Sequence, residues 1–268
     1  MLALTTMLTL PTLAAMTSTA LITGASSGLG EEFATRFAAR GENVVLVARR
    51  TDRLNTLARR IETEHGVTAT VVAMDLGVPG VGEALRTTLA DKGITPTTLV
   101  NNAGFGTHGR FADEDPERVA AEIALNVSAL VDLTHAFLPN LTGALINIAS
   151  TAAYQPTPNM AVYGATKAFV LNFTEALAFE HRASSLKILA LSPGPTRTEF
   201  FDVVGSKDAA VGNFQTSEQV VSTAMRALDS RRTPASIVSG LSNKISAGGV
   251  RLVPRSLAAK ISGRLLKA

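Results

Sequence analysis

Short runs of β-branched and aliphatic residues alternate along this chain with longer segments that have the periodicity of helices. The runs Thr19–Thr23 and Asn43–Ala48 are apolar at nearly every interior position. Strands of a parallel sheet have this pattern when helices cover both faces of the sheet. The alternation therefore predicts an α/β fold, a doubly wound parallel sheet in a single domain.

The same periodicities continue along the chain. Further strands are predicted at 69–74, 98–101, 144–149, 187–191 and 236–239, and helices at 28–40, 51–65, 80–92, 116–138, 161–182 and 217–228. Thr51, the pair Asp115-Pro116, and Thr216 with Gln219 are predicted to begin three of these helices. Residues 199–215 lose periodicity, and we expect them to form a mobile lid.

Length and composition agree with one folded domain. The chain has 268 residues, of which 46% are hydrophobic and 18% are charged, and a disordered chain is less apolar and more charged than this. It has no cysteine, and its four histidines stand far apart, so no metal site is expected. The lack of cysteine is compatible with a reducing compartment, and we expect a cytoplasmic protein.

The N-terminal residues 1–17 differ from the predicted domain at 18–250. They are apolar, but no Lys or Arg precedes the apolar run, so the basic region of a secretory signal is missing. The run is also short for a membrane span. We expect a disordered extension, with Met16 as an alternative start.

The C-terminal residues 251–268 form a basic amphipathic segment, and the chain has no acidic residue after Asp229. Leu257, Ile261 and Leu265 recur there at helical spacing. We expect this face to pack on the domain or on a partner subunit, and the alternative is weak peripheral contact with an anionic membrane surface. The chain has no recognisable nucleic-acid-binding motif, so no nucleic-acid partner is expected.

A glycine-rich turn lies between the first predicted strand and the first helix. Its sequence is TGASSGLG at 23–30. Glycine lets the backbone approach a ligand closely, and a helix N-terminus presents free N–H groups to a pyrophosphate. The spacing GxxxGxG departs from the usual GxGxxG. We expect a dinucleotide here, and the alternative is a tight turn that binds nothing.

The end of the second strand indicates which nicotinamide cofactor is preferred. A carboxylate at this place would bind the hydroxyls of the adenosine ribose, but the sequence has Arg49 and Arg50 instead. Guanidinium groups hold a 2′-phosphate through charge-assisted hydrogen bonds. The prediction is NADP(H) in preference to NAD(H), and the alternative is that both arginines are solvated.

Three polar residues point to proton-transfer chemistry. Tyr163 and Lys167 are four residues apart in a predicted helix, so they share one helix face. A neighbouring ammonium lowers the pKa of a phenol, and we expect Lys167 to act on Tyr163 in this way. Ser150 follows a strand, at the carboxyl edge where parallel sheets bind ligands.

Together these motifs resemble the short-chain dehydrogenase/reductase family, in its compact single-domain form, over about residues 18–240. The matching motifs are TGASSGLG at 23–30, Asp75-Leu76, Asn101-Asn102-Ala103-Gly104, Asn126, Ser150, YGATK at 163–167 and PGPTRT at 193–198. Each motif alone is weak, whereas their joint order along strands and helices is specific. The resemblance implies a Rossmann-like sheet and an oxidoreductase.

The resemblance also implies catalytic roles. Tyr163 would protonate the carbonyl oxygen during reduction and act as the base in the reverse reaction. Lys167 would lower its pKa and hold the nicotinamide ribose, and Ser150 would hydrogen-bond the reacting oxygen. Asn126 would hold a water that connects Lys167 to solvent. The hydride would come from the cofactor.

Other matched residues would contact the cofactor. They are Gly24, Ser26, Ser27, Gly28 and Leu29 at the phosphates, Arg49 and Arg50 at the 2′-phosphate, Asp75 and Leu76 at the adenine, Asn102, Ala103 and Gly104 near the adenosine ribose, and Pro193, Gly194, Thr196 and Thr198 towards the carboxamide. Asn101 is equally well explained as a structural tie between strands.

The predicted function is NADP(H)-dependent interconversion of a carbonyl and an alcohol. The expected mouth of the site is mostly aromatic and favours an apolar ketone or aldehyde; its residues are Phe105, His108, Tyr154, Gln155, Phe200 and Phe201. One alternative is a 3-oxoacyl thioester reductase whose acidic carrier protein docks on the basic surface. Another is a non-catalytic NADP(H)-sensing regulator. The resemblance further suggests a homodimer or homotetramer packed through the helices that carry Asn126 and Tyr163.

Overall fold

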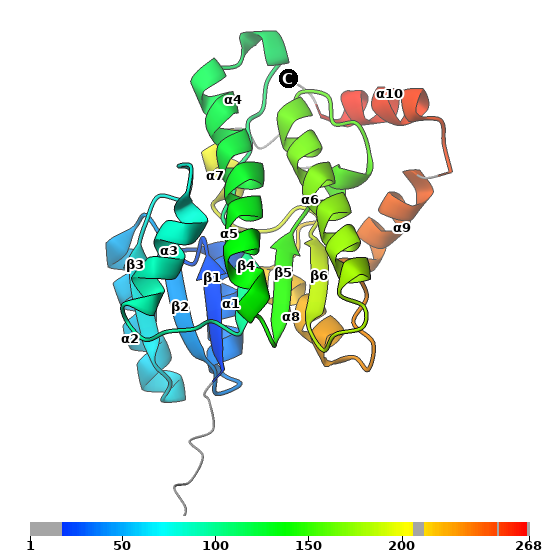
Figure 1. Ribbon diagram of the computed structural model, residues 1–268. Helices are drawn as coiled ribbons and strands as arrows, with labels where there is room; N and C mark the ends of the chain where they lie inside the picture. Colours follow the sequence, from blue (N-terminus) through cyan, green and yellow to red (C-terminus); the bar gives the residue numbers. More distant parts are fainter. Residues whose placement is uncertain (1–17, 206–211, 251, 267–268) are drawn as a thin grey trace, which may run out of the picture.

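Seven parallel strands form one sheet in the computed structural model, which describes residues 18–205, 212–250 and 252–266. The strands are β1 (Thr19–Thr23), β2 (Asn43–Ala48), β3 (Ala69–Ala73), β4 (Thr98–Asn101), β5 (Ala144–Ile148), β6 (Lys187–Ser192) and β7 (Ser236–Val238). Their order across the sheet is β3-β2-β1-β4-β5-β6-β7 (Figure 1). The predicted doubly wound α/β fold is therefore confirmed. The expected N-terminal extension, residues 1–17, lies outside the described residues.

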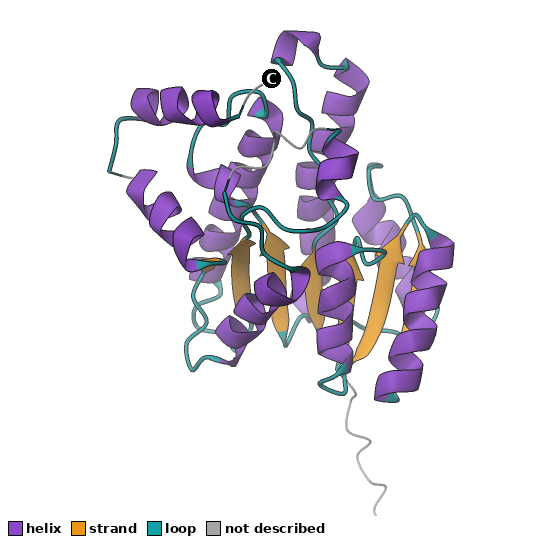
Figure 2. Cartoon of the chain, turned by 180° about the vertical axis from the view of Figure 1, so that it is seen from behind, coloured by secondary structure: helices purple, strands orange, loops and turns teal. Residues whose placement is uncertain are grey.

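Helices cover both faces of this sheet (Figures 1 and 2). They are α1 (Gly28–Ala38), α2 (Thr51–His65), α3 (Val81–Ala90), α4 (Pro116–Ile123), α5 (Leu130–Phe137), α6 (Ala161–Glu180), α7 (Phe200–Val204), α8 (Ser217–Asp229), α9 (Leu241–Val250) and α10 (Arg255–Leu265). The strand order reverses between β1 and β4, because β2 and β3 lie on one side of β1 and the later strands on the other. Such a reversal opens a crevice at the carboxyl ends of the strands, where ligands bind.

The core has two layers because successive residues of each strand point to opposite faces. Ile22 of β1 packs in a cluster with Phe33 of α1, which also takes in residues of α2 and α8. Leu21, the preceding residue, packs with Phe137 of α5 and with residues of α3. All four side chains are 0–2% exposed. This two-sided burial explains why the strands are apolar along their whole length.

Capping signals in the sequence set the starts of α4 and α8. The Asp115 side chain accepts a hydrogen bond from the N–H of Glu117 at the start of α4, and Thr216 with Gln219 forms the predicted capping box of α8. The prediction for α2 was wrong by one residue. Its N-cap is Arg50, and Thr51 lies inside the first turn. The side chain of Arg50 donates hydrogen bonds to Ser26, Ser27 and Glu199.

The helix predicted at 116–138 contains a wider turn. A π-helical segment, η2 (Ala124–Ala129), separates α4 from α5 and contains Asn126. An apolar period of 3.6 residues does not reveal one such turn, and π-turns are frequent at functional sites. The stretch Pro116–Asn140 is also long and apolar enough to cross a membrane, with a mean hydropathy of 1.3. Here its α5 part packs on the sheet as a core helix, with Leu133 and Phe137 buried.

The segment without periodicity is not irregular throughout. Its beginning forms the short helix α7, Phe200–Val204, and a parallel bridge joins Thr196 to Gln215. Residues 206–211 lie outside the described residues, so the expectation of a mobile lid is untested there. Helix α7 was missed because five residues are too few to establish a helical period.

The C-terminal helix α10 packs on the domain by a face other than that of Leu257, Ile261 and Leu265, so packing of these three side chains on a partner subunit stays a prediction. Its buried positions are Ala258 and Ser262, and the next residue after the helix, Leu266, is also buried. The expected face is Leu257, Ile261 and Leu265, which are 45%, 47% and 55% exposed. Each buried residue follows an expected residue by one position, so the buried face is rotated by about 100° about the helix axis from the expected face.

A buried polar network ties the middle of the sheet to α5 and α6. The amide of Asn101 donates to Thr134 Oγ1 at 3.0 Å and to Asn147 Oδ1 at 2.9 Å. Asn147 in turn donates to Thr174 Oγ1 at 2.9 Å. Asn101 therefore acts as a strand tie, the structural role that the sequence left open for it.

We predict that Asn147→Ala lowers the free energy of unfolding by about 1–3 kcal/mol, because Asn101 and Thr174 would each lose one buried hydrogen bond. Urea denaturation measures this change. The control is Asn172→Ala on α6, where the side chain is exposed; it should change stability by less than about 1 kcal/mol in either direction. Equal losses in both variants would contradict the prediction.

Candidate active site

A cavity of about 1020 Å³ lies along the carboxyl edge of the sheet. Every residue predicted to contact the cofactor lines it, from the glycine-rich turn to Thr198, and so do Ser150, Tyr163 and Lys167. Asn126 does not line it, and is buried behind the wall with 1% exposure. The structure therefore brings together residues from seven separate parts of the sequence into one site.

The glycine-rich turn forms one end of the cavity. Gly24 and Gly28 have positive φ values of 65° and 60°, which residues with a side chain rarely adopt. A Cβ atom at Gly28 would lie 2.9 Å from Thr198 Cγ2. Ser27 caps α1 without a side-chain hydrogen bond, so the first N–H groups of α1 are left for a ligand. A phosphate group fits this turn.

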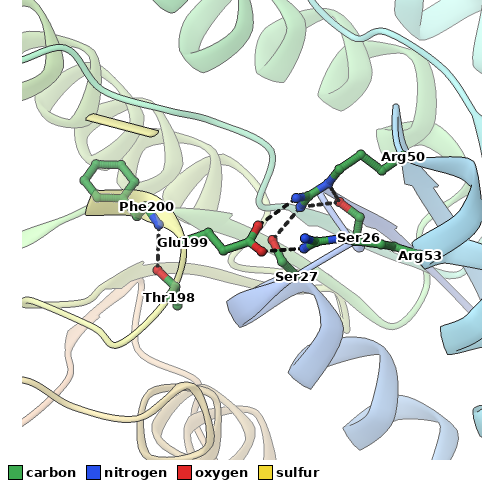
Figure 3. A network of polar contacts seen from close by, with 7 residues as sticks. All are labelled: Ser26, Ser27, Arg50, Arg53, Thr198, Glu199 and Phe200. Carbon is green, nitrogen blue, oxygen red and sulfur yellow. Dashed lines mark hydrogen bonds and ion pairs between the residues drawn. The ribbon is translucent and has the colours of Figure 1, made fainter. Parts of the chain in front are cut away.

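Two arginines from the start of α2 lie beside the turn (Figure 3). The Arg50 guanidinium donates to Ser26 Oγ and Ser27 Oγ, each at 2.9 Å, and to the Glu199 carboxylate at 2.7 Å. Arg53 donates to the other oxygen of the same carboxylate. These hydrogen bonds lower the pKa of Glu199 to about 2. Glu199 is thus ionised at neutral pH and occupies donors that a phosphate would use.

Tyr163 and Lys167 lie at the other end of the cavity, on α6. They are 9% and 6% exposed. The Lys167 ammonium donates to the backbone oxygen of Ile148 at 2.8 Å and lies 5.7 Å from the centre of the Tyr163 ring. Ser150, two residues after the end of β5, accepts a hydrogen bond from the N–H of Ala152 at 3.1 Å. Ser150, Tyr163 and Lys167, three of the four predicted catalytic residues, therefore line the same cavity near the end of β5.

Burial controls the acidity of these groups. It raises the pKa of Tyr163 to about 12, although a hydrogen bond with Ser150 acts in the opposite direction. Burial also lowers the pKa of Lys167 to about 8. Removal of the phenolate from water outweighs the hydrogen bond with Ser150, so the net pKa of Tyr163 lies above the usual value of a tyrosine. The expected lowering of this pKa by Lys167 stays a prediction. Tyr163 stays protonated at neutral pH.

Asn126 shapes the loop that follows β4. Its Oδ1 accepts from the N–H of Phe105 at 3.1 Å, and its Nδ2 donates to the Phe105 oxygen at 2.8 Å and to Thr166 Oγ1 at 3.2 Å. Both ends of the amide are thus used by the protein. Its predicted role in holding a water next to Lys167 stays a prediction.

Several wall residues were missed by the sequence analysis. They come mainly from α4, α9 and α10, and include Arg118, Ala121, Ser242, Asn243, Ser246, Ala247, Val250, Ile261, Leu265 and Leu266. A helical period shows which face is apolar but not which cavity that face borders. Two expected mouth residues, His108 and Tyr154, do not line the cavity, whereas Phe105, Gln155, Phe200 and Phe201 do. The Tyr154 hydroxyl lies 3.4 Å from Ser192 Oγ.

Comparison with known proteins agrees with this arrangement of fold and site. The family model described as short chain dehydrogenase matches residues 18–209. The chain belongs to the short-chain dehydrogenase/reductase family. It is therefore an oxidoreductase of carbonyl and alcohol groups that uses a nicotinamide cofactor.

Individual relatives are similar to this protein over most of its length. A sulfoacetaldehyde reductase from Chromohalobacter salexigens is 35% identical over 204 residues, which are 74% of this chain and 80% of the relative. A short-chain dehydrogenase from Sphingobium yanoikuyae, solved in complex with NADPH, is 34% identical with a TM-score of 0.78, and 88% of this chain and 93% of that one are covered. A 7β-hydroxysteroid dehydrogenase structure has a TM-score of 0.81 at 29% identity, covering 92% and 96% of the two chains.

We predict that Gly104→Ala lowers the free energy of unfolding of the protein by about 1–3 kcal/mol, the usual cost of overpacking. A Cβ atom there would lie 2.7 Å from Asn126 Oδ1 and 3.5 Å from Lys167 Nζ. Urea or thermal unfolding measures the effect. The control in the same loop is Gly109→Ala, where the nearest atom is 3.6 Å away, so stability should be unchanged or slightly raised. A stable Gly104→Ala protein would contradict the packing described here.

Proposed function

We propose that this protein is an NADP(H)-dependent oxidoreductase that interconverts an apolar ketone or aldehyde and the corresponding alcohol. The observation that carries the proposal is the single cavity that has Arg49 and Arg50 at one end and Ser150, Tyr163 and Lys167 at the other. One end suits an anionic phosphate and the other suits proton transfer.

The cofactor fits the residues that line the cavity. Gly24 and Gly28 line the cavity next to the N-terminus of α1, where a pyrophosphate would lie. Asp75 borders the cavity where the adenine would lie. Arg49 and Arg50 would hold a 2′-phosphate. When bound, the cofactor supplies or accepts the hydride. The protein therefore contributes orientation, proton transfer and stabilisation of charge.

Tyr163 donates its phenolic proton to the carbonyl oxygen during reduction. The pKa of about 12 keeps this proton in place at neutral pH, which is the state that reduction requires. Ser150, which hydrogen-bonds Tyr163, would donate to the same substrate oxygen. Lys167 replaces the lost proton, and its pKa of about 8 lets it exchange protons near neutral pH.

The wall beyond Tyr163 supports an apolar substrate. Phe200 lies against the Tyr163 ring, with 5.3 Å between centroids, and Phe201 packs edge-on against Phe200. Met160 and Leu266 complete this cluster. A wall of this kind favours bulky apolar carbonyl compounds, and the similarity to a 7β-hydroxysteroid dehydrogenase supports the same substrate class.

Two further expectations belong to the proposal. One is a cytoplasmic location, for which the absence of cysteine from the sequence is the support. The other is a homodimer or homotetramer packed through the helices that carry Asn126 and Tyr163. An apolar groove between α4 and α6 supports it; the groove is lined by Phe111, Ile123, Val127, Ala161, Val162, Ala165, Thr166 and Phe169.

We predict that the purified protein oxidises NADPH in the presence of apolar ketones or aldehydes and that Tyr163→Phe lowers kcat about 100- to 10,000-fold, the usual contribution of a general acid. NADPH binding, followed by fluorescence, should persist in the variant. Turnover of keto-acyl thioesters alone would support the 3-oxoacyl reductase alternative. Tight NADPH binding with no turnover of any compound would support the sensing regulator.

We predict that changing Arg49 and Arg50 together to serine weakens NADPH binding by about tenfold or more, because a phosphate loses charge-assisted hydrogen bonds. NADH binding should change much less, since NADH has no 2′-phosphate. Arg59→Ser, on an exposed part of α2, is the matched control for loss of positive charge. Tighter binding of NADH than of NADPH by the unaltered protein would contradict the proposed preference.

A further inference from the structure

Glu122 is a fully buried acidic residue with no part in the chemistry described so far. It lies on α4, four residues before Asn126, and is 0% exposed. Its Oε2 accepts hydrogen bonds from the N–H of Thr107 at 3.2 Å and from Thr107 Oγ1 at 2.9 Å. Burial of a carboxylate is costly, so the residue needs an explanation.

The hydroxyl of Thr107 connects Glu122 to a second carboxyl group. Thr107 Oγ1 lies 2.6 Å from Glu114 Oε2 as well as 2.9 Å from Glu122 Oε2. A hydroxyl has one proton and can donate to only one of the two oxygens. The other contact therefore takes its proton from a carboxyl group. Glu114 is half-buried and Thr107 is buried, so the three side chains run from the interior towards the surface.

Helix α4, which carries Glu122, packs against the catalytic helix α6. The Lys167 ammonium lowers the pKa of Glu122. The Glu122 carboxylate in turn raises the pKa values of Lys167 and Tyr163. The second oxygen of Glu122, Oε1, is buried and makes no hydrogen bond to the described part of the protein. A buried water is the ordinary partner of such an atom, and it would join Glu122 to the groups around Lys167.

The acidity of Glu122 suits proton exchange. Burial raises its pKa to about 7, the nearby Glu114 charge adds to this, and the hydrogen bonds from Thr107 and the Lys167 charge oppose it. Lys167 and Tyr163 on α6 and Glu114 in the preceding loop are thus the charged or titratable groups that act on it. A group with this pKa is protonated about half the time at neutral pH and can pass a proton in either direction.

We infer that Glu122, Thr107 and Glu114 form a proton path between solvent and Lys167. During reduction Tyr163 gives its proton to the substrate oxygen, Lys167 restores it, and Glu122 restores the proton of Lys167. The Thr107 hydroxyl passes its proton to Glu122 and takes one from Glu114, which is protonated by solvent. One proton enters for each carbonyl reduced, and oxidation of the alcohol runs the path in reverse. The inference rests on the proposed reductase activity.

The first experiment does not depend on a substrate. Infrared difference spectra of the full chain, recorded between about pH 5 and 9, follow the carbonyl stretch of protonated carboxyl groups. We expect a buried carboxyl that titrates near neutral pH, is absent in Glu122→Gln and is shifted in Thr107→Val. Glu117→Gln, an exposed residue of the same helix, should leave the band unchanged. A Glu122 that stays ionised through this range would overturn the inference.

The second experiment uses a carbonyl compound that the unaltered protein reduces. We expect Glu122→Gln and Thr107→Val to lower kcat for reduction about 10- to 100-fold, most strongly at alkaline pH, while NADPH affinity is unchanged. Small acidic buffers should restore much of the loss, as should Glu122→Asp. Restoration by buffer separates proton supply from a merely structural role.

Two results would count against the path. One is a pH profile and solvent deuterium isotope effect that are the same in Glu122→Gln and in the unaltered protein. The other is a loss of kcat that buffers do not restore. His108 follows Thr107 in the loop and has a buried Nε2, so His108→Asn is measured in parallel and should keep the pH profile. If Tyr163→Phe retains activity, the proposed reaction fails, whereas these results would remove only the path.

Discussion

The reversal of strand order between β1 and β4 is the constraint on which the site depends. Thr23 holds the two strand ends together, since its Oγ1 donates to the Val100 oxygen at 3.1 Å and accepts from the N–H groups of Asn102 and Ala103 at 2.9 and 3.0 Å. The chain then leaves β1 and β4 on different courses, which opens the cavity. A Cβ atom at Gly30 would lie 2.3 Å from the Gly24 oxygen and 2.7 Å from Asn102 Nδ2, so the glycine-rich turn packs closely against the end of β4.

The parts of the structure that follow from local pattern could be predicted from the sequence. The strands are recognisable because both faces are buried, and Tyr163 and Lys167 are paired because a helix brings residues four apart together. The contact of Glu199 with Arg50 joins residues that are 149 positions apart, and no local pattern reveals it. The π-turn at Asn126 and the buried face of α10 were likewise set by packing against neighbours.

Burial shifts the pKa values of the acids and of the lysine in opposite directions. It favours the neutral form of each one, so the tyrosine and the carboxyl of Glu122 become weaker acids and the lysine becomes a weaker base. The pKa values of Glu122 and Lys167 thereby approach each other, at about 7 and about 8. A proton passes readily in either direction between two groups whose pKa values are close. Desolvation is the largest of the causes that bring these two values together.

The contact of Glu199 with Arg50 and Arg53 makes the phosphate end and the substrate end of the cavity thermodynamically linked. Glu199 caps α7, and the next residue, Phe200, lies against Tyr163. A phosphate that takes the guanidinium donors competes with the carboxylate, so its binding free energy is reduced by the ion pairs that it replaces. In return it releases the first turn of α7 from the arginines. A dinucleotide without that phosphate would leave the ion pairs of Glu199 intact. The proposed cofactor preference would then be coupled to the position of Phe200 beside Tyr163.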